Sequence, residues 1–254
     1  MKKLFFISIM LVGLGACKKD TTVVNPGPPL PNNTKKLMRV EDVEYPNESV
    51  DFKYDAQGRM ISSESSEAKA TVDFKGSTAD YSVFLKLENR VGTAGTFSID
   101  NNNRAISYDM IWHPTAATSK NYQYAYSYTS DGFLSNISVN YNPGAASVQF
   151  EYANNNLNKQ TFYTNNVMNS YWVYSYGSDL NKTGLVDGFT VYTNCMGGNH
   201  VMNAWTKAEQ YSPQNVKIGE TQCINTVDAD GYVIKRVMHY MNDDTYEHYN
   251  YTYQ

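Results

Sequence analysis

The sequence predicts an all-β protein, an antiparallel meander of repeated hairpins that curls into a barrel or a strongly bent sheet. The clearest evidence lies around Asp131-Gly132. Tyrosine occupies every second position from Tyr122 to Tyr128, and the alternation resumes from Ile137 to Tyr141. A period of two is that of a strand with one packed face, and Asp-Gly supplies a residue that tolerates positive φ. The stretch therefore reads as strand, tight turn, strand.

The same pattern recurs at four further places. In each copy the fourth residue after the strand's last aromatic or β-branched residue is glycine or asparagine. These residues accept the left-handed conformation of a type I turn with a following bulge. The strands end at Tyr54, Ile99, Tyr128, Tyr152 and Val227, and the predicted turn residues are Gly58, Asn103, Gly132, Asn156 and Gly231. A spacing of 24 residues, from Tyr126 to Phe150 and on to Tyr174, equals two strands and two turns.

Residues 1–17 have the pattern of a secretory signal, with a basic start and a short apolar run. The run is too short for a convincing membrane-spanning helix. It ends in Leu14-Gly15-Ala16-Cys17, which resembles the lipobox of bacterial lipoproteins. That resemblance implies that Cys17 is lipid-modified and anchors the protein to a membrane. The alternative is an ordinary signal peptide that happens to end in cysteine.

Residues 18–36 read as a disordered tether, because the stretch from Asn25 to Asn33 is rich in proline and asparagine and has little to bury. Residues 37–254 read as a single β domain with a substantial core. The Lys18-Lys19-Asp20 start resembles the charged residues that follow the lipidated cysteine in many Bacteroidota surface lipoproteins. This favours an outer-membrane protein displayed on the cell surface over one on the periplasmic side.

Composition excludes one class of partner and constrains the cysteines. The net charge is −4 and no basic face is evident, so nucleic acid is not expected. Tyrosine (22) outnumbers phenylalanine (10) and tryptophan (3) together, which is typical of sheets with amphipathic aromatic faces. With Cys17 assigned to lipid, an exported compartment allows Cys195 and Cys223 to form a disulfide. The alternative is two buried thiols.

One segment, residues 199–210, does not read as a strand. Val201, Ala204, Trp205 and Ala208 fall on one helical face, and Pro213 follows. We therefore expect one short helix, enclosed in the loop that a Cys195–Cys223 disulfide would close.

The C-terminal hairpin offers candidate metal ligands. A turn centred on Asp243-Asp244 would place His239 opposite His248 and Met238 opposite Tyr249. Two imidazoles with carboxylates nearby, Glu247 among them, could hold a divalent metal. No third ligand is forced to converge, so a solvated pair is the alternative and no metal is assigned. Parity places Met238, Tyr240, Tyr249 and Tyr251 on one face and both histidines on the wetter face.

Three tryptophans, Trp112, Trp172 and Trp205, are candidates for an aromatic platform that stacks on sugar rings. Such a platform requires at least two of the rings to lie exposed and coplanar in one groove. The alternative is packing on sheet faces, because Trp172 lies within a strand-like Tyr-Trp-Val-Tyr stretch.

The aromatic-x-Tyr-x-x-x-Gly unit, with the lipobox, resembles a family of Bacteroidota lipoproteins that carry a domain of unknown function described as porin-like in fold. The residues that carry the resemblance are 52–60, 126–137 and 174–181. The unit is also similar to the YD repeats of Rhs-type shells, although its copies are too few and irregular for such a shell. Four tyrosines in succession on one face do not fit the aliphatic band of a transmembrane barrel. We therefore expect a barrel outside the bilayer.

The resemblance specifies fold better than function. The chain has no Gly-x-Ser-x-Gly elbow, no His-Glu-x-x-His motif and no phosphate-binding glycine loop. We therefore expect a non-enzymatic binding or scaffold module of the cell envelope, without a cofactor, whose partner is a glycan, a peptide or a protein. The alternative is a surface glycan-binding or glycan-degrading lipoprotein, because the carboxylates of a glycosidase can come from distant strands.

Overall fold

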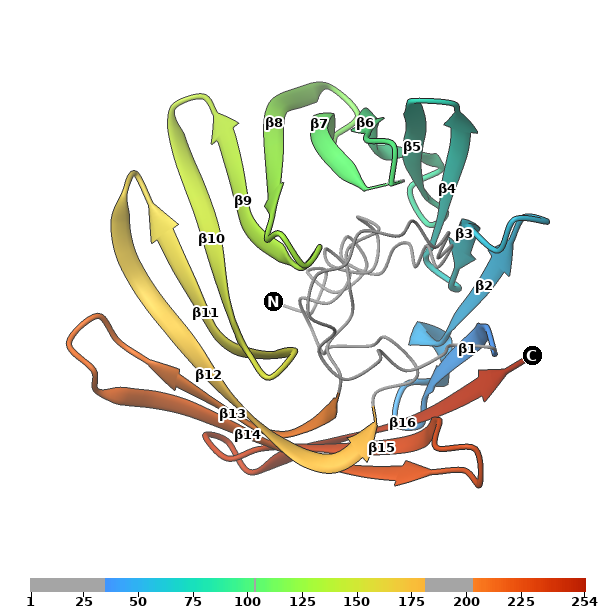
Figure 1. Ribbon diagram of the computed structural model, residues 1–254. Coiled ribbons are helices and arrows are strands. Elements are labelled where there is room, and N and C mark those ends of the chain that lie inside the picture. The colour runs from blue at the N-terminus through green and yellow to red at the C-terminus, as the bar shows by residue number, and fades with distance from the viewer. Residues whose placement is uncertain (1–34, 103, 181–202) are drawn as a thin grey trace.

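The computed structural model describes residues 35–102, 104–180 and 203–254, which form a closed antiparallel β-barrel (Figure 1). Each strand pairs with its sequence neighbours, and β16 pairs with β1 to complete the ring. The predicted all-β meander is confirmed, and of its two alternatives the barrel is the one formed. Closure leaves no unpaired edge strand in the sheet.

The barrel has sixteen strands. The strands are β1 (Leu37–Asp42), β2 (Val50–Tyr54), β3 (Met60–Glu64), β4 (Ala68–Lys75), β5 (Thr78–Leu85), β6 (Arg90–Ile99), β7 (Ala105–Thr115), β8 (Thr118–Tyr128), β9 (Leu134–Tyr141), β10 (Gly144–Ala153), β11 (Asn156–Thr164), β12 (Val167–Leu180), β13 (Asn203–Tyr211), β14 (Lys217–Val227), β15 (Val233–Tyr240) and β16 (Thr245–Tyr253). A 3₁₀ turn, η1 (Pro46–Glu48), follows β1. Within the described ranges, no helix has the length and apolar character needed to cross a membrane.

The meander brings alternate connections to opposite ends of the barrel. We call the terminal rim the end that holds the start of β1, the end of β16 and the described connections that follow even-numbered strands. The far rim is the end that holds the connections that follow odd-numbered strands.

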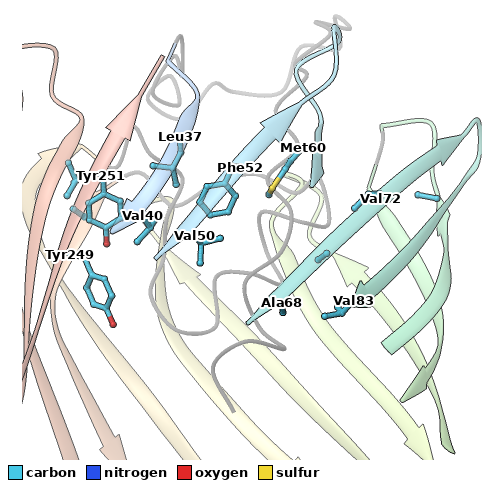
Figure 2. Close-up of a cluster of buried hydrophobic side chains, with 14 residues drawn as sticks. Leu37, Val40, Val50, Phe52, Met60, Ala68, Val72, Val83, Tyr249 and Tyr251 are labelled. Atoms are coloured by element: carbon cyan, nitrogen blue, oxygen red, sulfur yellow. The ribbon is translucent and has the colours of Figure 1, made fainter. Parts of the chain in front are cut away.

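Inward-facing side chains form two hydrophobic clusters. The first lines β1 to β5 and the C-terminal strands, and Figure 2 shows Phe52, Val50 and Tyr251 among its members. The second runs from β7 to β14 and is largely aromatic, with Tyr126 and Trp205 buried in it. Tyr81, Phe97 and Met238 pack against both clusters, so the two form a continuous lining.

Strand β8 shows the predicted alternation directly. Tyr126 is buried in the second cluster, and Tyr122, Tyr124 and Tyr128 are half-buried on the same face. The intervening residues Asn121, Gln123, Ala125 and Ser127 are exposed on the outer wall. The period-2 pattern therefore separates an aromatic inner wall from a polar outer wall.

The predicted turn residues are confirmed at three of the five copies. Gly58, Gly132 and Gly231 have φ of 81°, 84° and 82°. Asn103 lies outside the described residues. The prediction is wrong for Asn156, because the positive φ values there belong to Asn154 and Asn155, at 52° and 60°. Ala153 pairs directly with Asn156, so this copy makes a two-residue turn, and the register shift lies within the ladder, between Glu151 and Tyr152.

The repeated tyrosine has a structural role at the terminal rim. In five hairpins a tyrosine near the end of the even-numbered strand donates its hydroxyl proton to a backbone carbonyl near the start of the preceding strand, at 2.7–2.9 Å. We call these contacts tyrosine latches, and each ties together the open end of a hairpin whose turn lies at the far rim. Burial raises the pKa of Tyr54 to about 12 and also raises the pKa of Tyr152. The latches are Tyr54–Leu37, Tyr128–Ala105, Tyr152–Leu134, Tyr176–Leu157 and Tyr253–Val233.

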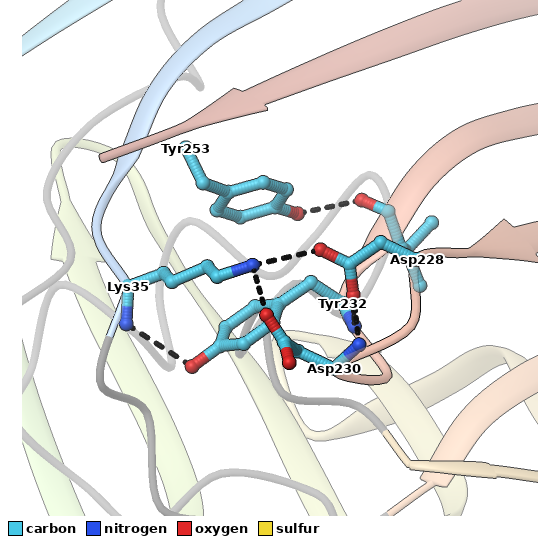
Figure 3. Close-up of polar contacts among 6 residues, drawn as sticks. Lys35, Asp228, Asp230, Tyr232 and Tyr253 are labelled. Atoms are coloured by element: carbon cyan, nitrogen blue, oxygen red, sulfur yellow. Dashed lines mark hydrogen bonds and ion pairs between the residues drawn. The ribbon is translucent and has the colours of Figure 1, made fainter.

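Lys35 and Lys36, the last residues of the predicted tether, contact the barrel. Lys36 exchanges two backbone hydrogen bonds with Gln254, at 2.8 and 2.9 Å. The Lys35 ammonium lies 2.9 Å from Asp228 and 2.6 Å from Asp230, in the turn between β14 and β15 (Figure 3). These contacts raise the pKa of Lys35 above its usual value. The remainder of the tether and the signal segment lie outside the described residues.

The predicted helix is wrong over its described part, because residues 203–210 belong to β13. Ala204, Trp205 and Ala208 are all buried, and this spacing resembles one face of a helix. The pairing of β12 with β13 explains this spacing. The adjacent residues Ser175 and Tyr176 pair with Lys207 and Trp205, which are two positions apart, so β13 has one extra residue at a bulge. The bulge shifts which residues face inward without ending the strand. Residues 199–202 lie outside the described part.

Candidate functional site

An aromatic strip runs along the inner wall of β7, β8 and β9. Tyr124 stacks on Tyr126 with ring centroids 6.4 Å apart and on Tyr108 at 5.7 Å. Tyr122 contacts Tyr141 at 5.8 Å and Trp112 at 6.4 Å, which continues the row toward the far rim. The register explains the row, because the paired positions on these three strands point inward together. The aromatic strip consists of Tyr108, Trp112, Tyr122, Tyr124, Tyr126 and Tyr141.

Exposure increases along the aromatic strip toward the far rim. Tyr108 and Tyr126 are buried, Tyr122, Tyr124 and Tyr141 are half-buried, and Trp112 is 37% exposed. The ammonium of Lys120 lies 5.7 Å from the centre of the Trp112 ring, within the range of a cation–π contact. The outer rings are thus accessible from solvent while the inner rings are held in place by the core.

The three candidate tryptophans do not share one exposed face. Trp205 is 3% exposed and packs edge-on against Tyr174, with ring centroids 6.4 Å apart. Trp172 is half-buried on the neighbouring strand β12 and packs against the second cluster. Trp112 lies on β7, five strands away from β12. Of the three, only Trp112 has an exposed ring, and the other rings of its row are tyrosines.

The histidine register was predicted incorrectly. His239 pairs with Tyr246, and His248 pairs with Val237, so the two histidines are not opposite one another. The turn spans four residues from Met241 to Asp244 and is not centred on Asp243-Asp244. The parity assignment holds, because Tyr249 and Tyr251 are buried in the first cluster.

Each histidine instead contacts its own carboxylate. His239 Nε2 lies 2.7 Å from Asp244, and His248 Nδ1 contacts Glu44. Glu247 is on the opposite face from both, because it pairs with the inward-facing Met238. In the part of the chain that the structure describes, no group of three or more His, Cys, Asp or Glu residues is placed to hold a metal ion.

The cysteine prediction is not tested. Cys223 lies in β14 and is buried in the second cluster. Cys195 and the proposed lipidation site Cys17 lie outside the described residues, so both the disulfide and the lipid anchor stay predictions.

Two carboxylates lie on the inner wall near the far rim, at the end of β1 and the start of β16. Glu247 accepts hydrogen bonds from the hydroxyls of Tyr240 and Tyr249, each at 2.8 Å. Asp42 accepts the backbone N–H of Tyr45 at 2.8 Å. Burial raises the pKa of the Asp42 carboxyl, and the charge of Glu247 raises it further. Burial and the same charge also raise the pKa of Tyr249.

A second group of buried polar side chains crosses the inner wall from β11 to β15. Arg236 is almost fully buried and donates from Nε to the side-chain oxygen of Asn225 at 2.8 Å. Asn225 in turn donates to the backbone carbonyl of Trp205 at 3.1 Å. Gln160 accepts the Tyr174 hydroxyl at 2.7 Å. These bonds satisfy polar atoms within an otherwise aromatic wall.

Sequence reasoning missed these inner-wall polar residues, although the parity rule was sufficient to find two of them. Arg236 has the parity of Met238 and Tyr240, and Glu247 has the parity of Tyr249 and Tyr251. If the period-2 alternation had been applied to charged residues as well, both side chains would have been predicted to face the barrel interior. We instead grouped Glu247 with the two histidines as a possible metal ligand, although charged side chains can be buried when they are hydrogen-bonded.

The closed antiparallel β-barrel is a fold that this chain shares with porin-like proteins of known structure. The chain is similar to a porin-like protein from Bacteroides uniformis, with 14% identity and a TM-score of 0.61 over 89% of this chain and 100% of that one. It is also similar to a porin-like protein from Bacteroides vulgatus, with 12% identity and a TM-score of 0.62 over 87% of this chain and 99% of that one. At these identities the likeness concerns the fold alone.

The fold is compatible with an outer-membrane or envelope location. No family model matches the chain. No curated protein matches it.

Proposed function

We propose that the protein is a non-enzymatic binding module of the cell envelope that holds its ligand against the aromatic strip. The observation that carries this proposal is the gradient of exposure from buried Tyr126 to exposed Trp112. A row of fixed rings presents apolar faces, and the tyrosine hydroxyls add hydrogen-bonding groups beside them. A pyranose ring has the complementary surface, since its C–H groups form an apolar face and its hydroxyls lie around the edge. The ligand class that fits best is therefore an oligosaccharide.

The polar outer wall supports a position outside the hydrocarbon core of a bilayer. Ion pairs cross it at several strands, for example Lys75 with Asp80 at 2.6 Å and Lys207 with Glu209 at 3.2 Å. A lysine or arginine on the lipid face of a transmembrane barrel costs about 2–4 kcal/mol near the midplane. In this proposal Cys17 carries the lipid that anchors the barrel to the outer membrane, at the cell surface.

The binding proposal is tested by titrating defined oligosaccharides of glucose, xylose and mannose into the purified protein and recording tryptophan fluorescence and heat. For the oligosaccharide that binds, Trp112→Ala with Tyr122→Ala is expected to weaken binding about tenfold or more, which corresponds to roughly 1.4 kcal/mol. The matched control is Tyr171→Ala with Tyr211→Ala, a stacked pair on the outer wall with ring centroids 5.2 Å apart. Equal losses in both double variants, or no binding by any oligosaccharide, would contradict the proposal.

The same titration separates binding from hydrolysis. A binding module returns the oligosaccharide intact, with no new reducing ends. The alternative, glycan hydrolysis, would draw on Asp42 and Glu247, because both lie on the inner wall near the far rim and the charge of Glu247 contributes to the raised pKa of Asp42. Reducing ends that accumulate with the wild type and disappear in Glu247→Gln would establish that alternative.

The anchor is tested by Cys17→Ser. The wild type is expected in the detergent-extracted membrane fraction, and the variant in the soluble fraction, because a cysteine thiol is the site of attachment for the acyl chains. Protease added to intact cells then reports on surface display of the wild type. A variant that stays with the membrane would show that lipid at Cys17 is not the attachment.

A further inference from the structure

The two rims of the barrel differ in their exposed apolar side chains. Fifteen large hydrophobic residues are exposed in the described ranges, and twelve of them lie in far-rim connections or in the far-rim half of a strand. The greatest exposure among the twelve is at Leu87, Val167 and Val216, at 79%, 66% and 59%. We call the twelve the far-rim fringe. They are Val43, Tyr45, Phe84, Leu87, Val91, Ile111, Trp112, Val167, Val216, Ile218, Met241 and Tyr246.

The far rim is also acidic. Its eight connections hold six acidic residues and one basic residue, a net charge of 1 − 6 = −5, whereas the whole chain carries −4. The described residues hold 16 Lys and Arg and 23 Asp and Glu, a net charge of 16 − 23 = −7, so the far-rim connections carry most of the negative charge of this part of the chain. The charged residues of the far-rim connections are Glu44, Glu48, Glu67, Lys86, Glu88, Asp243 and Asp244.

Neighbouring groups offset part of this charge. Lys86 pairs with Glu64 at 2.8 Å, so the only basic residue of the connections is already engaged. Arg90, at the start of β6, pairs with Glu88 at 2.6 Å. His239 contacts Asp244, and His248 contacts Glu44.

The terminal rim has a different character. Three of its turn carboxylates form ion pairs within the rim: Asp55 with Arg59 at 2.7 Å, Asp100 with Arg104 at 2.7 Å, and Asp228 with Lys35 at 2.9 Å. The tyrosine latches occupy backbone carbonyls at the same end. In the described residues the exposed large hydrophobics on this half of the barrel are limited to Ile106, Ile224 and Ile234.

We propose that the far rim is a docking surface for a basic polypeptide segment that also carries apolar side chains. Exposed apolar groups that gather on one face of a soluble protein mark interaction sites. The acidic connections between them favour a positively charged partner and steer its approach. The same charge opposes a rim-to-rim contact between two copies of this chain, because like charges would meet. It also opposes an anionic lipid surface.

The test measures binding of a labelled synthetic peptide in which leucine and lysine alternate in pairs, with a peptide that replaces each lysine by glutamate as the charge control. Fluorescence anisotropy is recorded with the purified protein at low salt and at about 0.5 M salt, where the Debye length falls to a few Å. The lysine peptide is expected to bind at low salt, and the glutamate peptide is expected not to bind.

Two far-rim variants and two matched controls locate the site. Leu87→Ser with Val167→Ser is expected to weaken binding about tenfold at both salt concentrations, because it removes apolar contacts. Asp243→Asn with Asp244→Asn is expected to weaken it about threefold or more at low salt only, because screening removes the charge contribution. Asparagine keeps one side-chain oxygen at each position, and it tolerates the φ of 55° at residue 244.

The controls are Ile106→Ser with Ile224→Ser, exposed hydrophobics away from the far rim, and Asp73→Asn, an exposed outer-wall carboxylate. Both are expected to bind like the wild type. Losses in the controls as large as those in the far-rim variants would overturn the proposal. Three other results would overturn it as well. The first is binding of the glutamate peptide, and the second is binding to zwitterionic or anionic vesicles that the far-rim variants weaken. The third is self-association of the protein that the Leu87→Ser, Val167→Ser variant abolishes. None of these results depends on oligosaccharide binding at the aromatic strip, so the two proposals fail independently.

Discussion

Replacing Gly95 with alanine is expected to destabilise the barrel by about 3 kcal/mol or more, one of the two largest effects we predict. Gly95 lies in β6 opposite Tyr81 and Met110, on the inward face. A Cβ atom at this position would lie 2.2 Å from the backbone oxygen of Asp109 and 2.6 Å from the ring of Tyr108. The backbone oxygen cannot move without distorting the β6–β7 ladder, and the Tyr108 ring is stacked on Phe97 at 4.0 Å.

Gly219 provides the matched control for this substitution. It is also an inward-facing strand glycine, but its Cβ would meet only side-chain atoms of Gln210 and Asn242, at 3.2–3.3 Å. Those side chains can shift, so Gly219→Ala is expected to change the free energy of unfolding by no more than about 1 kcal/mol. Urea unfolding followed by circular dichroism measures both variants. Equal stability of the two would show that the wall at Gly95 accommodates a methyl group.

Replacing Trp205 with alanine is expected to cost about 3–5 kcal/mol of unfolding free energy. The indole is 3% exposed and packs against Tyr174 within the second cluster. Its removal leaves a large cavity, and the pairing of Trp205 with Tyr176 in the β12–β13 ladder limits how far the backbone can move to fill it.

Two further variants show what this loss of stability depends on. Trp205→Phe tests the contribution of the indole N–H, and Trp112→Ala tests whether the loss requires a buried tryptophan. The indole Nε1 has no hydrogen-bond partner in the described residues, so Trp205→Phe loses little polar interaction and is expected to cost about 1 kcal/mol. Trp112→Ala removes an exposed ring and is expected to stay within about 1 kcal/mol of the wild type. A Trp112→Ala variant as unstable as Trp205→Ala would show that the aromatic strip is a packing element and would weaken its assignment as a binding surface.

The strands and turns could be predicted from the sequence wherever the signal was local. Two examples are the alternation of tyrosines in β8 and the positive φ at Gly58, Gly132 and Gly231. Both depend only on a residue and its immediate neighbours in the chain. The errors arose where two local solutions compete. Residues 203–210 suit either a helix face or a bulged strand, and pairing with β12 and β14 selects the strand. In the last hairpin a four-residue turn replaced the expected register because Tyr240 pairs with Thr245.

The candidate site was less predictable than the fold. Trp112 was identified as a candidate, but the tyrosines that extend its row come from β8 and β9 and were recognised only as a packed face. The far-rim fringe could not be foreseen at all, because its members are separated by tens of residues and none belongs to a motif. They are brought to the same end of the barrel only when the strands close into a ring.

The sequence by itself determined a meander of short strands reversed at glycine and asparagine, because side-chain alternation and backbone preference act over a few residues. The tertiary structure decided that Val40 meets Tyr251 to close the ring, that Arg236 and Glu247 are held inside, and that acidic and apolar loops share one rim. These outcomes depend on contacts between residues far apart in the chain, whose loop-closure entropy is offset only when the whole sheet forms.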